Sequence, residues 1–166
     1  NLDLGNHLTG LELGSTALYE WLADEPGVQF RGADYTHEIS VIRQLDNFVS
    51  INSAVEVDLY GQVNAEFAGG RQLSGTGGSV DFMRSARASK GGRSIVAMNA
   101  TARGGSVSRI VPKVEMVTAL RTDVDMVVTE FGVAELDGVS VAERARRLIR
   151  IAAPDFRDQL LDVAPV

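Results

Sequence analysis

The sequence contains no cysteine and no long apolar run. The absence of cysteine excludes disulfide bonds, thiolate metal sites and a cysteine nucleophile. No stretch approaches the ~20 apolar residues that a membrane-spanning helix needs. The chain also does not open on a basic segment followed by an apolar one, as a signal peptide does. These absences predict a cytoplasmic location and no membrane partner.

Acidic residues are missing between Asp81 and Glu115, although the 166 residues carry a net charge of −6. The overall charge argues against general nucleic-acid binding. The basic residues of the acid-free window are Arg84, Arg87, Lys90, Arg93, Arg103, Arg109 and Lys113. Such a local basic segment suits an anion, for example a phosphate-bearing cofactor. The alternative is a solvated face that pairs with acids elsewhere in the fold.

Hydrophobic periodicity predicts helices and strands that alternate along the chain. The expected helices cover residues 17–25, 39–45, 79–89 and 139–153, with a last short helix after Pro154. The expected strands cover residues 28–32, 48–67 and 124–131 and the segments that follow KGG (90–92) and RGG (103–105), with a loop over 132–138. Within 48–67 the alternation shifts near Asn52-Ser53, and Gly61-Gln62 is a candidate turn. Ser140 and Glu143 form a capping-box pattern at the start of the clearest helix. We therefore predict a single α/β domain with an open mixed or parallel sheet flanked by helices.

Glycine is concentrated in the segment Gly75-Thr76-Gly77-Gly78-Ser79, directly before an expected helix. Backbone N–H groups at a helix N-terminus bind anions or a developing oxyanion. The structural alternative is a tight connection without a ligand. The segment lacks the Gly-Lys-Ser/Thr of a Walker A motif and the last glycine of GxGxxG, which argues against ATP, GTP and NAD.

The alternating segment 48–67 places polar residues on the face opposite its apolar ones, provided that the strand is unbroken. These polar residues are Asn52, Glu56, Asp58, Gln62, Asn64 and Glu66. They form either the solvent face of a half-exposed sheet or the polar wall of a pocket. Two neighbouring carboxylates could hold a metal, but no histidine lies near them in the sequence, so we expect no metal site.

Histidine is scarce, since only His7 and His37 are present. A lone histidine is either structural or part of a site, and both interpretations of His37 stay open. Glu130 leaves the end of the apolar strand 124–131, where ligands bind in α/β sheets, or it caps a turn. The sequence shows neither a Ser-His-Asp triad nor a G-x-S-x-G elbow.

Several long segments occur in the order that is found in one enzyme family. They are SINSAVEVDLYGQVNAE, SGTGGSVDFMRSARASKGGRSIVAM, VSRIVP, DVDMVVTEFGVAELDGVS and ERARRLIRIAAPDFRDQL. The chain resembles, from about Gly10 to its end, the acetyl-CoA hydrolase/transferase family, the class I CoA-transferases of the 4-hydroxybutyrate and succinyl-CoA:acetate type. The resemblance implies a CoA-transferase fold, with residues 1–166 as a C-terminal domain that is incomplete at its N-terminal end.

The resemblance also implies a reaction. In this family a glutamate carboxylate attacks an acyl-CoA thioester, and a glutamyl-CoA thioester then passes CoA to a second carboxylate or is hydrolysed by water. The implied substrates are an acyl-CoA and a small carboxylate, with no metal and no covalently bound cofactor. Gly77 and Gly78 match the glycine pair that lines the oxyanion site, and His37 matches a polar residue opposite them. Many members read Tyr-x-Asn-Asp-Pro there, whereas this chain reads YTHEI (35–39).

The nucleophilic glutamate of the family lies upstream of everything that matches here. Because the stretch HLTGLELGSTALYEWL resembles sequence that comes after it, Glu12 is not its counterpart. We therefore expect the chain to supply the oxyanion pocket without the nucleophile and to be inactive alone. The N-terminal domain of the same enzyme is an expected partner, and exposed apolar surface predicts a homo-oligomer.

Further residues are expected to bind the thioester or CoA. They are Asn52, Glu56, Gln62, Asn64, Gly75, Ser79, Lys90 and Arg93, the last two as partners of the CoA phosphates. Two alternatives stay open. In a self-sufficient chain Glu38, Glu56 or Glu130 is the nucleophile. In the other alternative the domain is non-catalytic and serves dimerisation or regulation.

Overall fold

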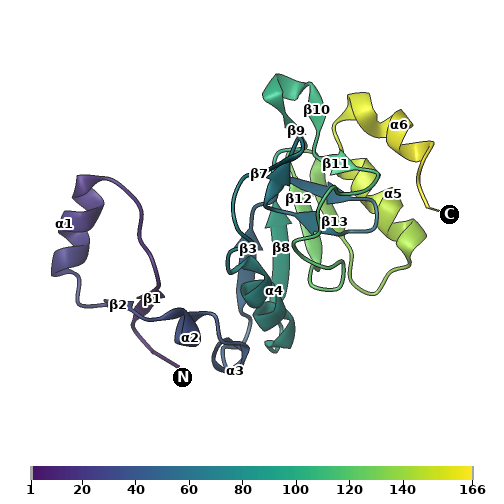
Figure 1. Ribbon diagram of the computed structural model, residues 1–166. Coiled ribbons are helices and arrows are strands. Elements are labelled where there is room, and N and C mark those ends of the chain that lie inside the picture. Colours follow the sequence, from purple (N-terminus) through teal and green to yellow (C-terminus); the bar gives the residue numbers. More distant parts are fainter. Residues whose placement is uncertain (1, 166) are drawn as a thin grey trace.

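A mixed four-stranded sheet is the central feature of the computed structural model, which describes residues 2–165 (Figure 1). Its strands, in spatial order, are β13 (Gly132–Glu135), β12 (Met126–Thr129), β8 (Arg93–Ala97) and β3 (Val49–Asn52). β3, β8 and β12 run parallel, and β13 returns antiparallel to β12. The predicted α/β class with a mixed sheet is confirmed.

β13 lies where the sequence predicts a loop. Met126 pairs with Glu135 and Thr129 with Gly132, so that the chain reverses within two residues. Only one β13 side chain, that of Ala134, is buried, whereas Val133 is 56% exposed. The loop prediction is wrong because a short edge strand with one small buried side chain has hardly any alternation of apolar and polar residues.

Two helices pack on this sheet. α4 (Ser79–Ala88) contacts β3 and β8, and α5 (Val141–Ile151) contacts β12 and β13. Met83 of α4 and Leu148 of α5 join Val127 of β12 in one buried apolar cluster. Burying side chains of this size stabilises the fold by about 1.5–3 kcal/mol each, so this cluster holds both helices against the strands.

α5 begins where the sequence predicts it. Ser140 Oγ accepts a hydrogen bond from the Glu143 N–H at 3.2 Å. The Glu143 carboxylate turns away from the cap and accepts hydrogen bonds from Arg146 and Arg147 at 2.9 and 2.8 Å. Ser140 therefore makes its half of the predicted capping box, and the glutamate forms ion pairs along the helix instead.

The predicted strand 48–67 is divided between two sheets. The chain leaves β3 at residues 53–54 and enters a three-stranded sheet composed of β11 (Ile110–Val111), β4 (Glu56–Asp58) and β5 (Val63–Asn64). Gly61 turns the chain between β4 and β5 at φ +88, a conformation that favours glycine. Because the strand is broken, one alternation does not govern the whole segment.

Short elements complete the part of the chain that follows β5. They are the hairpin β6 (Phe67–Ala68) and β7 (Arg71–Gln72), the pair β9 (Thr101–Ala102) and β10 (Val107–Ser108) around η1 (Arg103–Gly105), and the C-terminal η2 (Pro154–Phe156) and α6 (Arg157–Leu161). The short helical end after Pro154 is as predicted.

The N-terminal segment extends away from the sheets (Figure 1). It holds the parallel pair β1 (His7–Thr9) and β2 (Val28–Phe30) and the helices α1 (Thr16–Asp24), α2 (Ala33–Thr36) and α3 (Ile39–Ile42). No residue of α1 is buried, and Trp21 is 53% exposed. α3 packs against α4, so this segment returns to the domain and carries α2 to the side of the glycine loop. No helix within residues 2–165 is both long and apolar enough to cross a membrane.

Candidate functional site

The glycine loop and the end of α2 face each other across a hollow of about 550 Å³. The lining residues are Ala33, Asp34, His37, Glu38, Gly77, Gly78 and Asp81. Three residues that the sequence assigns to one site, His37, Gly77 and Gly78, are thus brought together from segments about 40 positions apart. The remaining polar lining is acidic and comes from α2, its C-terminal turn and the first turn of α4.

Gly78 lies directly against the imidazole of His37. A Cβ at residue 78 would overlap Cδ2 and Nε2 of that ring, so only glycine allows this approach. The ring also packs on Phe82 of α4, with ring centroids 4.5 Å apart. The histidine is therefore held between the glycine loop and α4, with its Nε2 edge at the loop.

The loop presents backbone at the start of α4. Gly77 adopts φ +62, a left-handed conformation, and a Cβ added there or at Gly75 would meet no atom within 4 Å. Gly78 is the N-cap residue of α4, and no side chain caps this helix end. The first N–H groups of α4, beginning at Ser79, are therefore not bound by a capping side chain, and a helix N-terminus of this kind favours negative charge.

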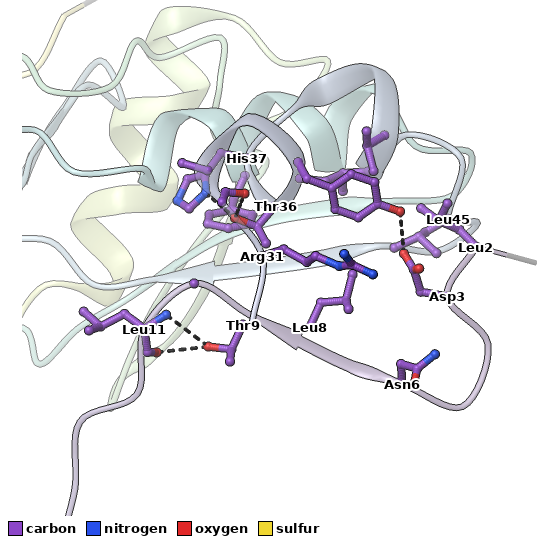
Figure 2. A pocket seen from close by; sticks show the side chains of 17 residues that line it. Leu2, Asp3, Asn6, Leu8, Thr9, Leu11, Arg31, Thr36, His37 and Leu45 are labelled. Carbon is purple, nitrogen blue, oxygen red and sulfur yellow. Dashed lines mark hydrogen bonds between the residues drawn. The ribbon is translucent and has the colours of Figure 1, made fainter. Parts of the chain in front are cut away.

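A threonine fixes the other edge of the imidazole. Thr36 Oγ1 lies 2.9 Å from His37 Nδ1 (Figure 2). Tyr35, the preceding residue of α2, is also held in place, because its hydroxyl donates a hydrogen bond to Asp3 at 2.7 Å. This hydrogen bond raises the pKa of Tyr35. These contacts hold α2 and position His37.

Glu38 is the carboxylate next to the histidine in the sequence, and it lines the same hollow. Its Oε1 accepts a hydrogen bond from the Ser40 N–H at 2.9 Å and caps α3. The pKa of Glu38 is lowered mainly by the hydrogen bond from the Ser40 backbone and further by one from the Ser40 side chain. Among the carboxylates considered as nucleophiles, Glu38 is the one that shares a hollow with Gly77 and Gly78.

The polar residues of 48–67 lie in another place and bond mainly to one another. Asn64 is fully buried; its Nδ2 donates to Glu56 Oε1 at 3.0 Å and to the Phe67 carbonyl at 2.8 Å. Gln62 Nε2 donates to the buried Asp58 at 2.8 Å. These bonds tie β4 and β5 together, so the side chains serve the three-stranded sheet. A polar pocket wall made by them stays a prediction.

Asn52 and Glu130 lie at carboxyl ends of strands in the four-stranded sheet. Asn52 ends β3, and its Nδ2 donates to Ser50 Oγ at 2.7 Å. Glu130 follows β12 and accepts a hydrogen bond from the Ala100 N–H at 2.7 Å. Glu130 therefore holds the turn after β8, as its structural interpretation predicts, and it lies outside the hollow of His37.

Lys90 and Arg93 lie beyond the opposite end of α4 from the glycine loop. The ten residues of α4 span about 15 Å at 1.5 Å per residue. Arg93 lines a polar hollow of about 380 Å³ with Asp125, Glu135 and Asp137. The structure thus does not join these two cations to Gly77 and Gly78, and carboxylates surround one of them.

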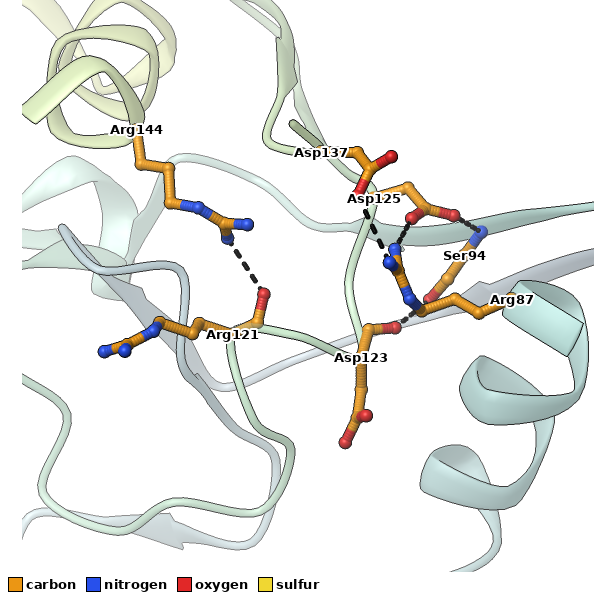
Figure 3. A network of polar contacts seen from close by, with 7 residues as sticks. All are labelled: Arg87, Ser94, Arg121, Asp123, Asp125, Asp137 and Arg144. Carbon is orange, nitrogen blue, oxygen red and sulfur yellow. Dashed lines mark hydrogen bonds and ion pairs between the residues drawn. The ribbon is translucent and has the colours of Figure 1, made fainter. Parts of the chain in front are cut away.

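The same end of the domain carries a network of ion pairs (Figure 3). Arg87 of α4 pairs with Asp125 and, at 3.2 Å, with Asp137. Asp125 also accepts the Ser94 N–H at 2.8 Å. Arg87, one of the basic residues between Asp81 and Glu115, is therefore engaged in ion pairs within the domain. This agrees with the alternative that the basic segment pairs with acids elsewhere in the fold.

Thr36 and Phe82 contact His37 in the structure, but no sequence pattern indicates them as site residues. Thr36 is one hydroxyl among many, and Phe82 belongs to an ordinary apolar pattern of α4. The only signal is their position, one directly before His37 and the other four residues after Gly78. Within residues 2–165 no three His, Asp or Glu side chains are grouped so that they could hold a metal ion.

Comparison with known proteins identifies a family for the chain. The chain matches the acetyl-CoA hydrolase/transferase C-terminal domain over residues 14–164. It is 48% identical to a 4-hydroxybutyrate coenzyme A transferase of Clostridium kluyveri over 90% of this chain and 36% of the relative. It is 45% identical to a probable butyrate:acetyl-CoA coenzyme A-transferase of Syntrophomonas wolfei over 99% of this chain and 38% of the relative.

A solved structure shows the same fold. RipA from Yersinia pestis superposes with a TM-score of 0.88 at 44% identity, covering 98% of this chain and 36% of that one. The chain thus spans little more than a third of the length of the proteins that it matches. Since the family match covers most of residues 2–165, the chain belongs to the acetyl-CoA hydrolase/transferase family and corresponds to its C-terminal domain.

Proposed function

We propose that this chain is the C-terminal part of an enzyme that moves CoA between an acyl-CoA thioester and a carboxylate, or hydrolyses acetyl-CoA. The observation that carries the proposal is the packing of His37 over Gly78 at the uncapped N-terminus of α4. This arrangement offers hydrogen-bond donors from two sides to one small hollow. The similarity to coenzyme A transferases supports CoA thioesters as substrates.

The proposed role of the hollow is to stabilise negative charge. When a carboxylate attacks a thioester carbonyl, the carbonyl oxygen becomes an oxyanion; CoA leaves as thiolate and an acyl–glutamyl anhydride forms. Attack of the thiolate on the glutamyl carbonyl then gives the glutamyl-CoA thioester and releases the acyl carboxylate. The proposed donors to this oxygen are the backbone N–H groups at Gly77–Ser79 and the imidazole of His37, and each such donor contributes a few kcal/mol.

The attacking glutamate is proposed to lie outside this chain. Glu56 accepts hydrogen bonds from Asn64 and Glu115, and Glu130 binds the Ala100 N–H, so both carboxylates hold backbone or side chains in place. Glu38 faces the hollow, but its pKa is lowered by Ser40, and a more acidic carboxylate is a weaker nucleophile. The family's N-terminal domain is the proposed source of the nucleophile and of the remaining CoA surface.

Nuclear magnetic resonance titration of the ¹⁵N-labelled chain with CoA and acetyl-CoA tests the proposal. The account predicts the largest amide shifts at Gly77, Gly78 and Ser79. Shifts confined to other segments contradict the assignment of the hollow. Titration at two salt concentrations adds a measure of phosphate contacts.

A double substitution examines the proposed phosphate partners. Lys90→Ala with Arg93→Ala is expected to weaken CoA binding and to flatten its salt dependence, because two cations are removed. Arg121→Ala with Arg150→Ala removes the same charge from other exposed positions and serves as the control. Affinity equal to that of the unsubstituted chain removes Lys90 and Arg93 from the CoA site.

A non-catalytic dimerisation or regulatory domain is the second candidate, and the exposed apolar side chains of the N-terminal segment favour it. Leu11 is 71% exposed, Leu13 80% and Trp21 53%. Concentration-dependent mass in sedimentation, combined with no CoA binding, supports this candidate over the enzyme.

A further inference from the structure

The carbonyl oxygen of Gly32 is fully used by backbone donors. It accepts hydrogen bonds from the N–H groups of Tyr35 and Thr36, both at 3.0 Å. A carbonyl oxygen has two lone pairs, so the Thr36 hydroxyl, as a third donor to this oxygen, makes the weakest of the three hydrogen bonds. The Thr36 hydroxyl lies 3.3 Å from this oxygen but only 2.9 Å from His37 Nδ1.

The shorter of these two distances favours donation of the single Thr36 hydroxyl proton to the imidazole. We propose that Thr36 is a positioning residue that holds His37 in the tautomer with its proton on Nε2, because Nδ1 accepts the Thr36 hydroxyl hydrogen. Nε2 and Cδ2 are the ring atoms nearest to Gly78, so this tautomer places an N–H donor at the glycine loop. The opposite tautomer presents a lone pair there, which repels an oxyanion.

The inference rests on the proposed function only where it concerns turnover. In the proposed enzyme, the donor from Nε2 meets the same oxygen as the N–H groups of the loop. The charged groups around the ring are Asp34 and Glu38 on either side of it in the chain and Asp81 of α4. These carboxylates cannot donate when ionised, so an imidazole with its proton on Nε2 is the side-chain donor of the hollow.

Long-range ¹H–¹⁵N spectroscopy of the imidazole rings in the 166-residue chain tests the tautomer directly. We expect one dominant neutral tautomer of His37, with the proton on Nε2. Thr36→Val is expected to shift His37 toward a mixture of both tautomers, and Thr36→Ser to preserve the single one. Thr36→Ala replaces the valine variant if that protein does not fold.

His7, exposed on β1, is the internal control, since its ring signals do not change in these variants. A His37 ring that carries its proton on Nδ1 in the unsubstituted chain overturns the inference. So do tautomer populations that are equal in the threonine and valine proteins.

Kinetics of the full-length enzyme separate the inference from the proposed function. Thr36→Val is expected to lower kcat about three- to tenfold, as for the loss of one hydrogen bond, with KM unchanged and with rescue by Thr36→Ser. A tautomer that shifts while kcat stays constant overturns the role of Nε2 in turnover and leaves the tautomer assignment standing. A KM effect without rescue by serine indicates a merely structural threonine and overturns the positioning role.

Discussion

Gly78 shows how one missing methyl group can shape a site. The space that a Cβ would fill at Gly78 is occupied by the imidazole of His37, whereas the same space at Gly75 is open. Gly78→Ala is expected to displace the ring and to cost about 1–3 kcal/mol of unfolding free energy, as overpacking does. Urea unfolding and the ring signals of His37 report both effects.

Gly75→Ala is the matched control for that substitution, because its Cβ meets nothing within 4 Å. Equal stability and an undisturbed His37 signal in both alanine proteins would show that the imidazole does not lie against Gly78. The sequence predicts that Gly77, Gly78 and His37 meet only through the family resemblance. Spacing alone cannot bring residue 37 to residue 78, since the contact depends on how the N-terminal segment returns to α4.

Glu143 links one residue to the pH dependence of stability. Hydrogen bonds from Arg147 first, and from Arg146, lower its pKa below the ordinary 4.5. A carboxyl whose folded pKa is lowered stabilises the protein at pH above its unfolded value, and this stability is lost as the pH falls through the folded pKa. Glu143→Gln is therefore expected to be less stable than the original at neutral pH.

The stability difference between the two proteins should shrink as the pH drops below 4.5, where the carboxylate becomes protonated in both states. Urea midpoints across this range measure it. A difference that stays constant down to acid pH contradicts the ion pairs of Glu143 as its origin.

At the scale of elements, α5 is the part that the sequence predicts best. Its cap residue and the proline after its end agree with the structure, and its buried face includes Ala145, Leu148 and Ile149. The segment 48–67 is the opposite case. Polar residues alternate with apolar ones in β3 of one sheet and in β4 and β5 of another. The shift of the pattern near Asn52-Ser53 and the turn at Gly61 are visible in the sequence, but the pattern does not reveal that the chain changes sheets.

The packing of α5 gives a prediction about the core. Leu148 is fully buried in the cluster that joins the helices to the sheet. Leu148→Ala is expected to lower the unfolding free energy by about 2–5 kcal/mol, through lost burial and the cavity left behind. Arg150→Ala, at an exposed position of the same helix, is expected to change it by less than about 0.5 kcal/mol. Comparable losses in urea unfolding of the two proteins contradict the assigned core.

At the scale of the molecule, the sheets and helices from β3 onward enclose their own core, whereas the N-terminal segment does not. α1 has no buried residue, and its two aromatic side chains, Tyr19 and Trp21, are exposed. The sequence predicts α1, β2 and α3 of this segment from local signals, but it predicts neither β1 nor α2. Its extended course follows from contacts that local signals do not encode, which is why exposure of Trp21 and Leu13 is visible only in the structure.

The central claim is that this chain supplies the oxyanion side of a CoA-transferase site and that the attacking glutamate lies elsewhere in a longer enzyme. The most direct measurement is CoA release from acetyl-CoA, with and without acetate or succinate, by the 166-residue chain and by the full-length protein that contains it. We expect turnover by the full-length protein and none by the 166-residue chain. Turnover by the 166-residue chain that disappears on Glu38→Ala would contradict it, because the nucleophile would then lie beside His37.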